Sequence, residues 1–439
     1  MIKGYEKYIK TSVECFGDIP NHWNSLMLRY VLKYEKGKNA SIYTKEFLAD
    51  NIGEIPVYSG QTSNEGIMGY TNRIDYTLPI GLLVTTVGAK AMTVRKVSNE
   101  FCLSQNCALI TEKNPDVNLD YYKYALEILF DYEKNKLADI IQPSLRFEDL
   151  DRYRIILPPL TEQSQIARFL DHQTSLIDEI INRKEKQIEL LKEKRQAIIN
   201  ETVTKGLNPD AKMKDSGIEW LGEIPEHWRL SKVKYEFYLK ARVGWKGLTS
   251  DEFEEESYAY LVTGTDFKQR NINWKTCYQV NKERYEDDPF IILKNGDLLI
   301  TKDGTIGKTS IVKDLDKPAC LNSGIFVLRP LKNNVNNEFL YWIMNSSSFS
   351  IFNDLTSTGA TIKHLYQNVF QEFSISIPHI EEQNEIVEYL AKQTAFVDNI
   401  IEQTVYQITK IKEYRQSIIS EAVTGKIDVR DWQPNNSSN

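Results

Sequence analysis

The sequence predicts a duplicated α/β (α+β) protein, in which two mixed α/β domains are joined by two long antiparallel helices. The helices would form a coiled-coil spacer with pseudo-two-fold symmetry. Three observations predict this fold. Two framework segments occur twice in the chain, the longer of them carries an apolar heptad, and the stretches between the repeats combine short β-branched runs with a helical segment.

The shorter repeat lies near the beginning and again near the middle of the chain. "TSVECFGDIPNHW" (residues 11–23) returns as "SGIEWLGEIPEHW" (residues 216–228), and both copies close on the dipeptide His-Trp. Most other positions are identical or conservative. An internal repeat of this kind indicates that one structural unit is used twice.

The longer repeat is helical. Residues 161–204 return without a gap as residues 381–424, and neither copy contains an internal Gly or Pro. Apolar residues follow a heptad with one polar member: Leu170, Ile177, Lys184, Leu191 and Ile198, and then Leu390, Val397, Thr404, Ile411 and Ile418. Prolines precede both segments, and Gly206 and Gly425 follow them, as helix stop signals do.

Each helix would be about 65 Å long at 1.5 Å per residue. Neither is apolar on all sides, so each needs a partner, and the equally long second copy is the simplest one. Antiparallel pairing would then carry the chain to the second domain and back. The alternative is that each amphipathic helix packs only against its own domain.

The repeats divide the chain into framework, domain and helix segments. These are an N-terminal framework segment (1–23), the first α/β domain (24–157), a first spacer helix (158–206), a second framework segment (207–228), the second α/β domain (229–377), a second spacer helix (378–425) and a C-terminal tail (426–439). The two domains are dissimilar apart from a faint common frame. In that frame "GLLVTTVGAK" faces "DLLITKDGTIGK", and "CLSQNCALI" faces "CLNSGIFVL".

The stretch "TKDGTIGKTS" ends like a phosphate-binding P-loop. A P-loop needs a first glycine five positions before its Gly-Lys pair, and Lys302 occupies that position. The residues after Lys308 form a β-branched run typical of a strand, whereas a P-loop opens a helix. We therefore expect a β-turn built on Gly304 and Gly307.

Composition narrows the class of protein. The formal net charge of −7 argues against a protein that coats nucleic acid, although a basic face could still read a specific sequence. No apolar run approaches the roughly 18 residues of a membrane span, and the first residues lack a signal-peptide core, which favours a cytoplasmic location. The five cysteines form no CxxC pair, and we find no catalytic motif.

The combination of motifs resembles the specificity subunit of Type I restriction–modification systems. The resemblance rests on the divergent domains, each followed by "PPLTEQ" or "IPHIEEQ" and a long helix, and on "SGIEWLGEIPEHW". It implies that each domain is a target-recognition domain that reads one half of a bipartite, asymmetric site on double-stranded DNA. The helices would set the gap between half-sites and dock two methyltransferase (modification) subunits.

The same resemblance implies a division of labour. The chain itself would be non-catalytic and bind no cofactor or metal, while S-adenosylmethionine, ATP and Mg²⁺ would belong to the methyltransferase and the motor–nuclease (restriction) subunits. Two other hypotheses stay open from the residues alone. One is a nucleotide hydrolase, and the other is a coiled-coil adaptor whose domains bind proteins; salt-dependent, site-specific DNA binding would exclude the adaptor.

Candidate DNA-binding residues are basic, aromatic and polar side chains near the start of each domain and in its loops. They are Lys38, Gln61, Thr86, Lys90, Lys240, Arg242, Trp245, Lys246, Lys302, Thr305, Lys308, Lys363 and His364. Lys302 and Lys308 would contact phosphates, with Thr86 and Lys90 in the same frame of the first domain. The alternative is that these loops only turn the chain. Candidate partner-binding residues are identical in both helix repeats: Gln163, Arg195, Gln383 and Arg415.

Overall fold

The computed structural model describes residues 3–11, 13–60, 64–88, 90–137, 142–242, 253–268, 270–356 and 364–434. It divides into two compact units. The first unit is Met1–Lys184 with Tyr406–Asn439, and the second unit is Glu185–Val405. Each unit therefore contains one α/β domain, part of one long helix and part of the other.

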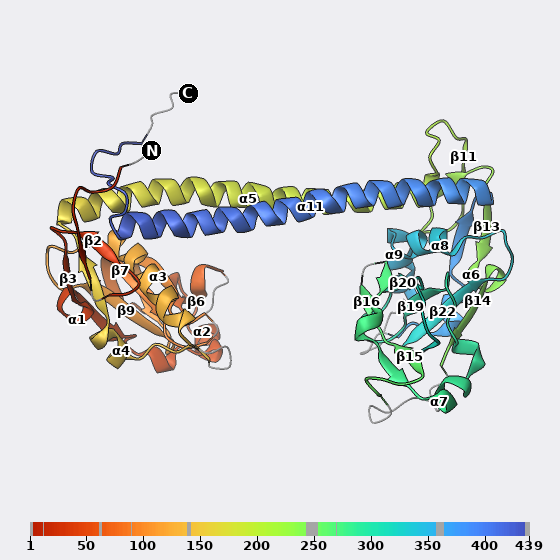
Figure 1. The fold of residues 1–439 in the computed structure, drawn as a ribbon, viewed down its shortest axis with the longest axis horizontal. Coiled ribbons are helices and arrows are strands. Elements are labelled where there is room, and N and C mark those ends of the chain that lie inside the picture. Colours follow the sequence, from red (N-terminus) through yellow and green to blue (C-terminus); the bar gives the residue numbers. More distant parts are fainter. Residues whose placement is uncertain are drawn as a thin grey trace. The chain divides into compact units, whose positions relative to one another are not determined.

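Both predicted long helices are present (Figure 1). Helix α5 spans Leu160–Lys205 and helix α11 spans Ile380–Val423. Gly206, directly beyond α5, and Gly425, two residues beyond the end of α11, have φ angles of 75° and 70°, a left-handed conformation that glycine adopts without a steric penalty and that commonly ends helices. The stop signals are confirmed. Among the described residues, no helix is long and apolar enough to cross a membrane.

The helices run antiparallel, as predicted. In the first unit Lys184 Nζ donates to Gln407 Oε1 at 2.6 Å, and Arg415 Nε donates to Asp178 Oδ1 at 3.0 Å. Residue numbers thus fall along α5 as they rise along α11. In the second unit, the end of α5 likewise lies beside the beginning of α11, since a Cβ atom on Gly206 would lie 3.1 Å from the Glu382 carboxylate.

The first domain is built on a six-stranded sheet of order β4-β9-β7-β8-β5-β6. The strands are β4 (Leu32–Lys36), β5 (Ile55–Tyr58), β6 (Ile67–Thr71), β7 (Tyr76–Thr85), β8 (Val94–Leu103) and β9 (Cys107–Glu112). Only β5 and β8 pair in parallel. Helix α3 (Leu119–Asn135) packs against β7 and β8, and α2 (Lys45–Asp50) packs on β6.

In the second domain, the strands that correspond to those of this single sheet form two separate sheets. One has the order β14-β22-β19-β20 and the other β18-β15-β21. Their bounds are β14 (Phe237–Ala241), β15 (Ala259–Val262), β18 (Tyr278–Val280), β19 (Leu298–Thr301), β20 (Thr309–Ile311), β21 (Ala319–Leu321) and β22 (Ile325–Pro330). The helices are α7 (Lys282–Glu286), α8 (Asn337–Met344) and α9 (Ser347–Thr356), and a small hairpin joins β16 (Phe267–Lys268) to β17 (Asn271–Ile272).

The framework segments fold alike in both units. The hairpin of β1 (Tyr8–Lys10) and β2 (Asp18–Pro20) has its counterpart in β11 (Met213–Asp215) and β12 (Glu223–Pro225). Each domain is closed by a pair of strands, β3 (Asn24–Met27) with β10 (Arg154–Leu157), and β13 (Arg229–Lys232) with β23 (Ser374–Ile377). Short helices follow and precede these strands: α1 (Leu28–Val31), α4 (Phe147–Arg152), α6 (Val233–Glu236) and α10 (Gln367–Phe370).

These closing strands join the two ends of each inserted domain. Asn24 pairs with Leu157, and Arg229 pairs with Ile377. Because the chain enters and leaves each domain at one place, the sequence of the domain can change without moving the framework around it.

Candidate nucleic-acid interface

The described residues of "TTVGAK", which are 85–88 and Lys90, and the stretch "TKDGTIGK" lie in equivalent hairpin loops. The first joins β7 to β8 and the second joins β19 to β20. In both, a threonine at the end of the first strand binds across the loop: Thr85 Oγ1 accepts from the Thr93 N–H, and Thr301 Oγ1 accepts from the Lys308 N–H, each at 3.0 Å. A strand, Thr309–Ile311, follows Lys308, which confirms the prediction that this is a turn and not a P-loop.

Two further segments meet each hairpin loop. In the first unit the Thr86 N–H donates to the Asn106 carbonyl at 2.9 Å, and the Thr86 carbonyl accepts from the Leu145 N–H at 2.8 Å. In the second unit Lys302 makes the same two bonds, to the Gly324 carbonyl at 2.9 Å and from the Leu365 N–H at 3.0 Å. We call this meeting of three loops the juncture. It is the same in both units.

The side chains at the two junctures differ. In the first unit they surround a surface hollow of about 460 Å³, whose polar lining includes Lys36, Gln105, Arg146 and Glu148. In the second unit Asp303 Oδ1 lies 2.7 Å from His364 Nδ1, and its Oδ2 lies 3.6 Å from Lys302 Nζ. A shared backbone thus presents a mixed surface of two cations, an amide and a carboxylate in one domain and an aspartate–histidine pair in the other.

The predicted DNA-binding residues differ in exposure. Lys90, Lys308 and Thr305 lie exposed on the hairpin loops, Lys302 is partly exposed, and Thr86 is buried, so its side chain offers little surface to a ligand. His364 is exposed and joins the second juncture, as described above.

Of the basic residues near the domain starts, Lys38 lies just after strand β4 and Lys240 lies on strand β14. Lys38 Nζ lies 4.6 Å from the centre of the Tyr76 ring, and Lys240 Nζ lies 5.8 Å from that of Phe290; both lysines are exposed. Four further candidates lie outside the described residues: Gln61, Trp245, Lys246 and Lys363.

Arg242 does not fit the predicted phosphate contact. Its side chain is 2% exposed, and Nε donates to the Leu321 carbonyl at 3.0 Å. A guanidinium bound to the backbone inside the domain ties β14 to the end of β21 and does not reach an external phosphate. A basic residue close to an aromatic one in the sequence is typical of a nucleic-acid contact, but this pattern does not reveal burial.

The glutamines predicted to bind a partner serve the chain itself. Gln163 and Gln383 are fully buried. Gln163 Nε2 donates to the carbonyls of Asp116 and Pro158, and its Oε1 accepts from the Asn118 N–H at 2.8 Å. Gln383 makes the equivalent bonds to Asn334, Pro378 and Asn336. Each glutamine fastens the start of a long helix to its domain, so the partner-binding prediction is wrong for both.

The two predicted partner-binding arginines join the helices. Arg415 Nε lies 3.0 Å from Asp178 Oδ1 in the first unit, and Arg195 Nε lies 2.8 Å from Asp398 Oδ1 in the second. These ion pairs occupy equivalent positions of the repeat. Identity between the two copies therefore reflects pairing within the chain, and it gives no support for a contact with another protein.

The sequence did not reveal the role of the glutamate beside each buried glutamine. Glu162 Oε2 accepts from the Tyr5 hydroxyl at 2.7 Å and from Trp23 Nε1 at 2.9 Å, while Oε1 lies 2.8 Å from His22 Nε2. Burial, reinforced by the bond to Glu162, raises the pKa of Tyr5 and keeps the phenol protonated as a donor. This carboxylate attaches the framework segment to the beginning of α5.

The second unit repeats the attachment. Glu382 Oε1 accepts from Trp228 Nε1 at 3.1 Å, and Oε2 lies 2.9 Å from His227 Nε2. The His-Trp and Glu-Gln dipeptides, which occur in both copies, were the sequence signal for this attachment. Polar and aromatic residues that are identical in both copies indicate a role that the two units share. Their mutual contact spans more than a hundred residues, which a repeat alone cannot show.

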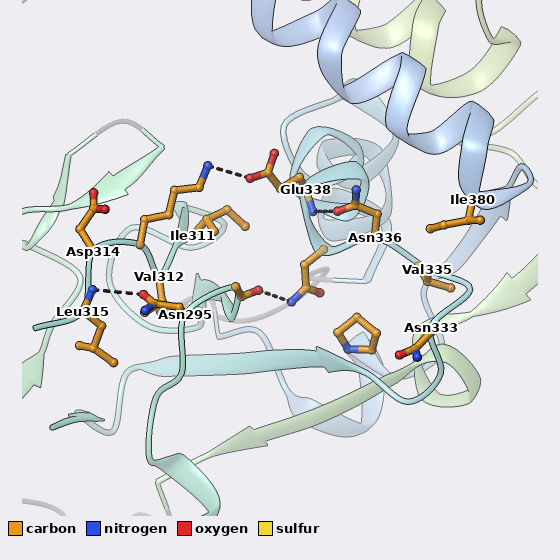
Figure 2. A pocket seen from close by; sticks show the side chains of 14 residues that line it. Asn295, Ile311, Val312, Asp314, Leu315, Asn333, Val335, Asn336, Glu338 and Ile380 are labelled. Atoms are coloured by element: carbon orange, nitrogen blue, oxygen red, sulfur yellow. Dashed lines mark hydrogen bonds and ion pairs between the residues drawn. The ribbon is translucent and has the colours of Figure 1, made fainter. Parts of the chain in front are cut away.

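The polar groups of a pocket at the start of α8 are largely used in structural bonds (Figure 2). Asn336 Oδ1 accepts from the Glu338 N–H at 2.8 Å, Asn295 Oδ1 accepts from the Leu315 N–H at 3.1 Å, and the Glu338 carboxylate pairs with Lys313 at 2.7 Å. The lining contains no Ser, Thr, Cys, His or Tyr. It therefore offers no hydroxyl or thiol nucleophile beside a base.

Known proteins share the sequence features of this chain. A family model described as "Type I restriction modification DNA specificity domain" matches residues 20–190 and again residues 246–410. The Type I restriction enzyme MjaVIII specificity subunit of Methanocaldococcus jannaschii is 26% identical over 424 residues, which cover 94% of this chain and 95% of that protein. The EcoBI specificity subunit of Escherichia coli is 22% identical, with 76% and 71% covered.

Solved structures agree on the fold. A chain from a study of complex assembly and conformational transition of the type I R-M system matches with a TM-score of 0.70 at 15% identity, covering 92% of this chain and 98% of that one. The HsdS subunit from Thermoanaerobacter tengcongensis matches with a TM-score of 0.50 at 15% identity, covering 93% and 98%. Because the two matches of the family model together cover most of the chain, the protein belongs to the family of Type I restriction–modification DNA specificity subunits.

Proposed function

We propose that each unit reads one half of a bipartite, asymmetric DNA sequence. The chain thereby determines at which DNA site its partner subunits methylate or restrict. The observation that carries this proposal is the juncture. Two domains hold the same three loops by the same backbone bonds but present different side chains there. Equal backbones with unequal side chains suit two readers of the same kind of ligand with different sequences.

The long helices provide the surface for the partners. Leu176 in the first unit and Phe396 in the second occupy equivalent positions of the repeat and are 45% and 63% exposed. Other large apolar side chains on the helices are exposed too, among them Ile180, Tyr406 and Tyr414 in the first unit and Leu190 in the second. Among the described residues of the helices, the one matched pair, Leu176 and Phe396, favours docking of a partner present in two copies, which we assign to two methyltransferase subunits.

The remaining roles follow from this assignment. The methyltransferase subunits would bring S-adenosylmethionine, and motor–nuclease subunits would bring ATP and Mg²⁺ for restriction. The chain would bind no cofactor and catalyse no reaction, and the helices would set the gap between the half-sites.

The test is to co-express the chain with a cognate methyltransferase subunit and to map methylated bases across the host DNA. We expect methylation at one bipartite motif. Exchanging residues 24–157 for the equivalent domain of a relative should change one half-site, and exchanging residues 229–377 should change the other. Matched exchanges of residues 11–23 or 216–228, which belong to the framework, should leave the motif unaltered. A stable complex that methylates no motif would overturn the proposal in favour of an adaptor.

A further inference from the structure

The two junctures place one pair of side chains at the same position in each domain. The carbonyls of Thr86 and Lys302 each accept from a leucine N–H, Leu145 in the first unit and Leu365 in the second. The residue after each carbonyl and the residue before each leucine are therefore equivalent. Val87 thus corresponds to Asp303, and Ser144 corresponds to His364.

The backbone supports this equivalence independently. Val87 and Ser144 form an isolated antiparallel bridge in the first unit. In the second unit the side chains of Asp303 and His364 meet at 2.7 Å across the same gap. The turns that complete the junctures also correspond, because the Ser104 N–H donates to the Tyr58 carbonyl at 2.9 Å, as the Asn322 N–H does to that of Val262 at 3.0 Å.

All four side chains of this position reach the surface. Val87 is 47% exposed, an unusual place for a β-branched apolar residue in a polar loop, and Ser144 is exposed. The side chains of Asp303 and His364 are 37% and 42% exposed. Neither pair belongs to a core cluster among the described residues, so their identities are not dictated by packing.

The chemistry of the pairs differs in a way that a DNA base can sense. The Asp303 carboxylate occupies Nδ1 of His364 and so fixes the ring. Since the residues that the structure describes give Nε2 no hydrogen bond, Nε2 is the ring atom left to bind a polar base edge. A valine methyl group can only contact an apolar group, and in the major groove that group is the thymine methyl. Lys302, beside the same carboxylate, supplies a cation for the flanking phosphate.

The geometry points to Asp303 with His364, and Val87 with Ser144, as base-reading pairs of the second and first recognition domains. This inference rests on the proposed function and deepens it. His364 binds a hydrogen-bonding base edge and Asp303 positions its ring, whereas Val87 contacts a thymine methyl. The fixed backbone of the juncture brings either pair to the same depth against the DNA.

The experiment transplants one pair into the other domain. Asp303→Val with His364→Ser gives the second domain the pair of the first, and Val87→Asp with Ser144→His does the reverse. Each variant is co-expressed with the methyltransferase subunit, and the methylated motif is mapped. We expect the first variant to lose its preference at one base pair of one half-site by roughly ten- to a hundredfold and the second to change one base pair of the other half-site.

Single variants and controls separate the outcomes. His364→Gln keeps a polar, exposed side chain and should relax the same base pair, while His379→Ala, at an exposed histidine of the same unit, should leave the motif intact. An unchanged motif with weaker methylation at all sites would overturn the inference and make the pair a phosphate contact. Failure of the unmodified chain to methylate any bipartite motif would instead refute the proposed function, before any variant is compared.

Discussion

The two recognition domains arrange equivalent strands differently, as one continuous sheet in the first unit and as two separate sheets in the second. In the first unit β8 is long enough to pair with β7 on one side and with β5 further along, so the sheet is continuous. In the second unit the same path is divided between β20 and β21, which lie in separate sheets. Likewise α3 is one helix, whereas its counterpart is interrupted between α8 and α9. The two domains have thus diverged in whether a strand or a helix is continuous or interrupted. The backbone hydrogen bonds of the juncture and the pairing of the closing strands are the same in both.

A single position shows how such divergence is tolerated. Gly37 follows β4 in the first unit, and a Cβ atom there would lie 2.8 Å from the Leu103 carbonyl oxygen. At the equivalent place in the second unit stands Arg242, whose guanidinium donates to the Leu321 carbonyl. One domain brings the backbones together, and the other bridges them with a side chain. The contact is kept although the residue is not.

The largest predicted effect concerns the framework attachment. Glu162→Ala leaves two buried donors, the Tyr5 hydroxyl and Trp23 Nε1, without an acceptor, whereas Glu382→Ala leaves only Trp228 Nε1 buried and unpaired. We expect a loss of about 3 kcal/mol in the free energy of unfolding for the first variant and about 1–2 kcal/mol for the second. Urea unfolding gives the total, and hydrogen exchange assigns it to a unit.

Glu162→Gln serves as the control, since its amide oxygen still accepts one bond and should restore part of the loss. Equal losses for the two alanine variants would show that water satisfies Tyr5 and Trp23, and the asymmetry between the attachments would then be unimportant.

Much of the fold could be predicted because its signals are local or repeated. The heptad and the glycines at 206 and 425 gave both long helices nearly to the residue, and the common frame identified the paired hairpin loops. The buried contacts of Glu162, Gln163 and Arg242 could not be predicted in the same way. Each of these residues binds a partner far away in the sequence, and charge or identity does not indicate whether a side chain faces inward.

The next effect tests the corrected role of Arg242. Arg242→Met keeps the volume of the side-chain stem but removes the donor to the buried Leu321 carbonyl. We expect the free energy of unfolding to fall by about 2 kcal/mol and the salt dependence of DNA binding to stay the same. Unchanged stability with a shallower salt dependence would restore the original interpretation of Arg242 as a phosphate contact.

A smaller effect should come from the exposed lysine of the second hairpin loop. Lys308 is held by its backbone, which exchanges two hydrogen bonds with Thr301, so Lys308→Ala should leave stability unchanged. Losing one phosphate contact should lower the slope of log affinity against log salt concentration by about one, equally for all DNA sequences. Lys90→Ala should do the same in the first domain, and Lys282→Ala on α7 is the control. A change of sequence preference would mean that Lys308 contacts a base.

The smallest effect tests whether the helices are equivalent in the two units. Asp178–Arg415 and Asp398–Arg195 have similar geometry, and in both pairs the carboxylate is about half exposed, so solvent screens them. We expect Arg415→Ala and Arg195→Ala each to lower the free energy of unfolding by less than about 1 kcal/mol, with equal coupling energies in double-mutant cycles with the aspartates. Methyltransferase docking should persist in both variants, because the arginines are engaged within the chain. Loss of docking in either variant at unchanged stability would show that the same side chains also contact the partner, as the sequence predicts.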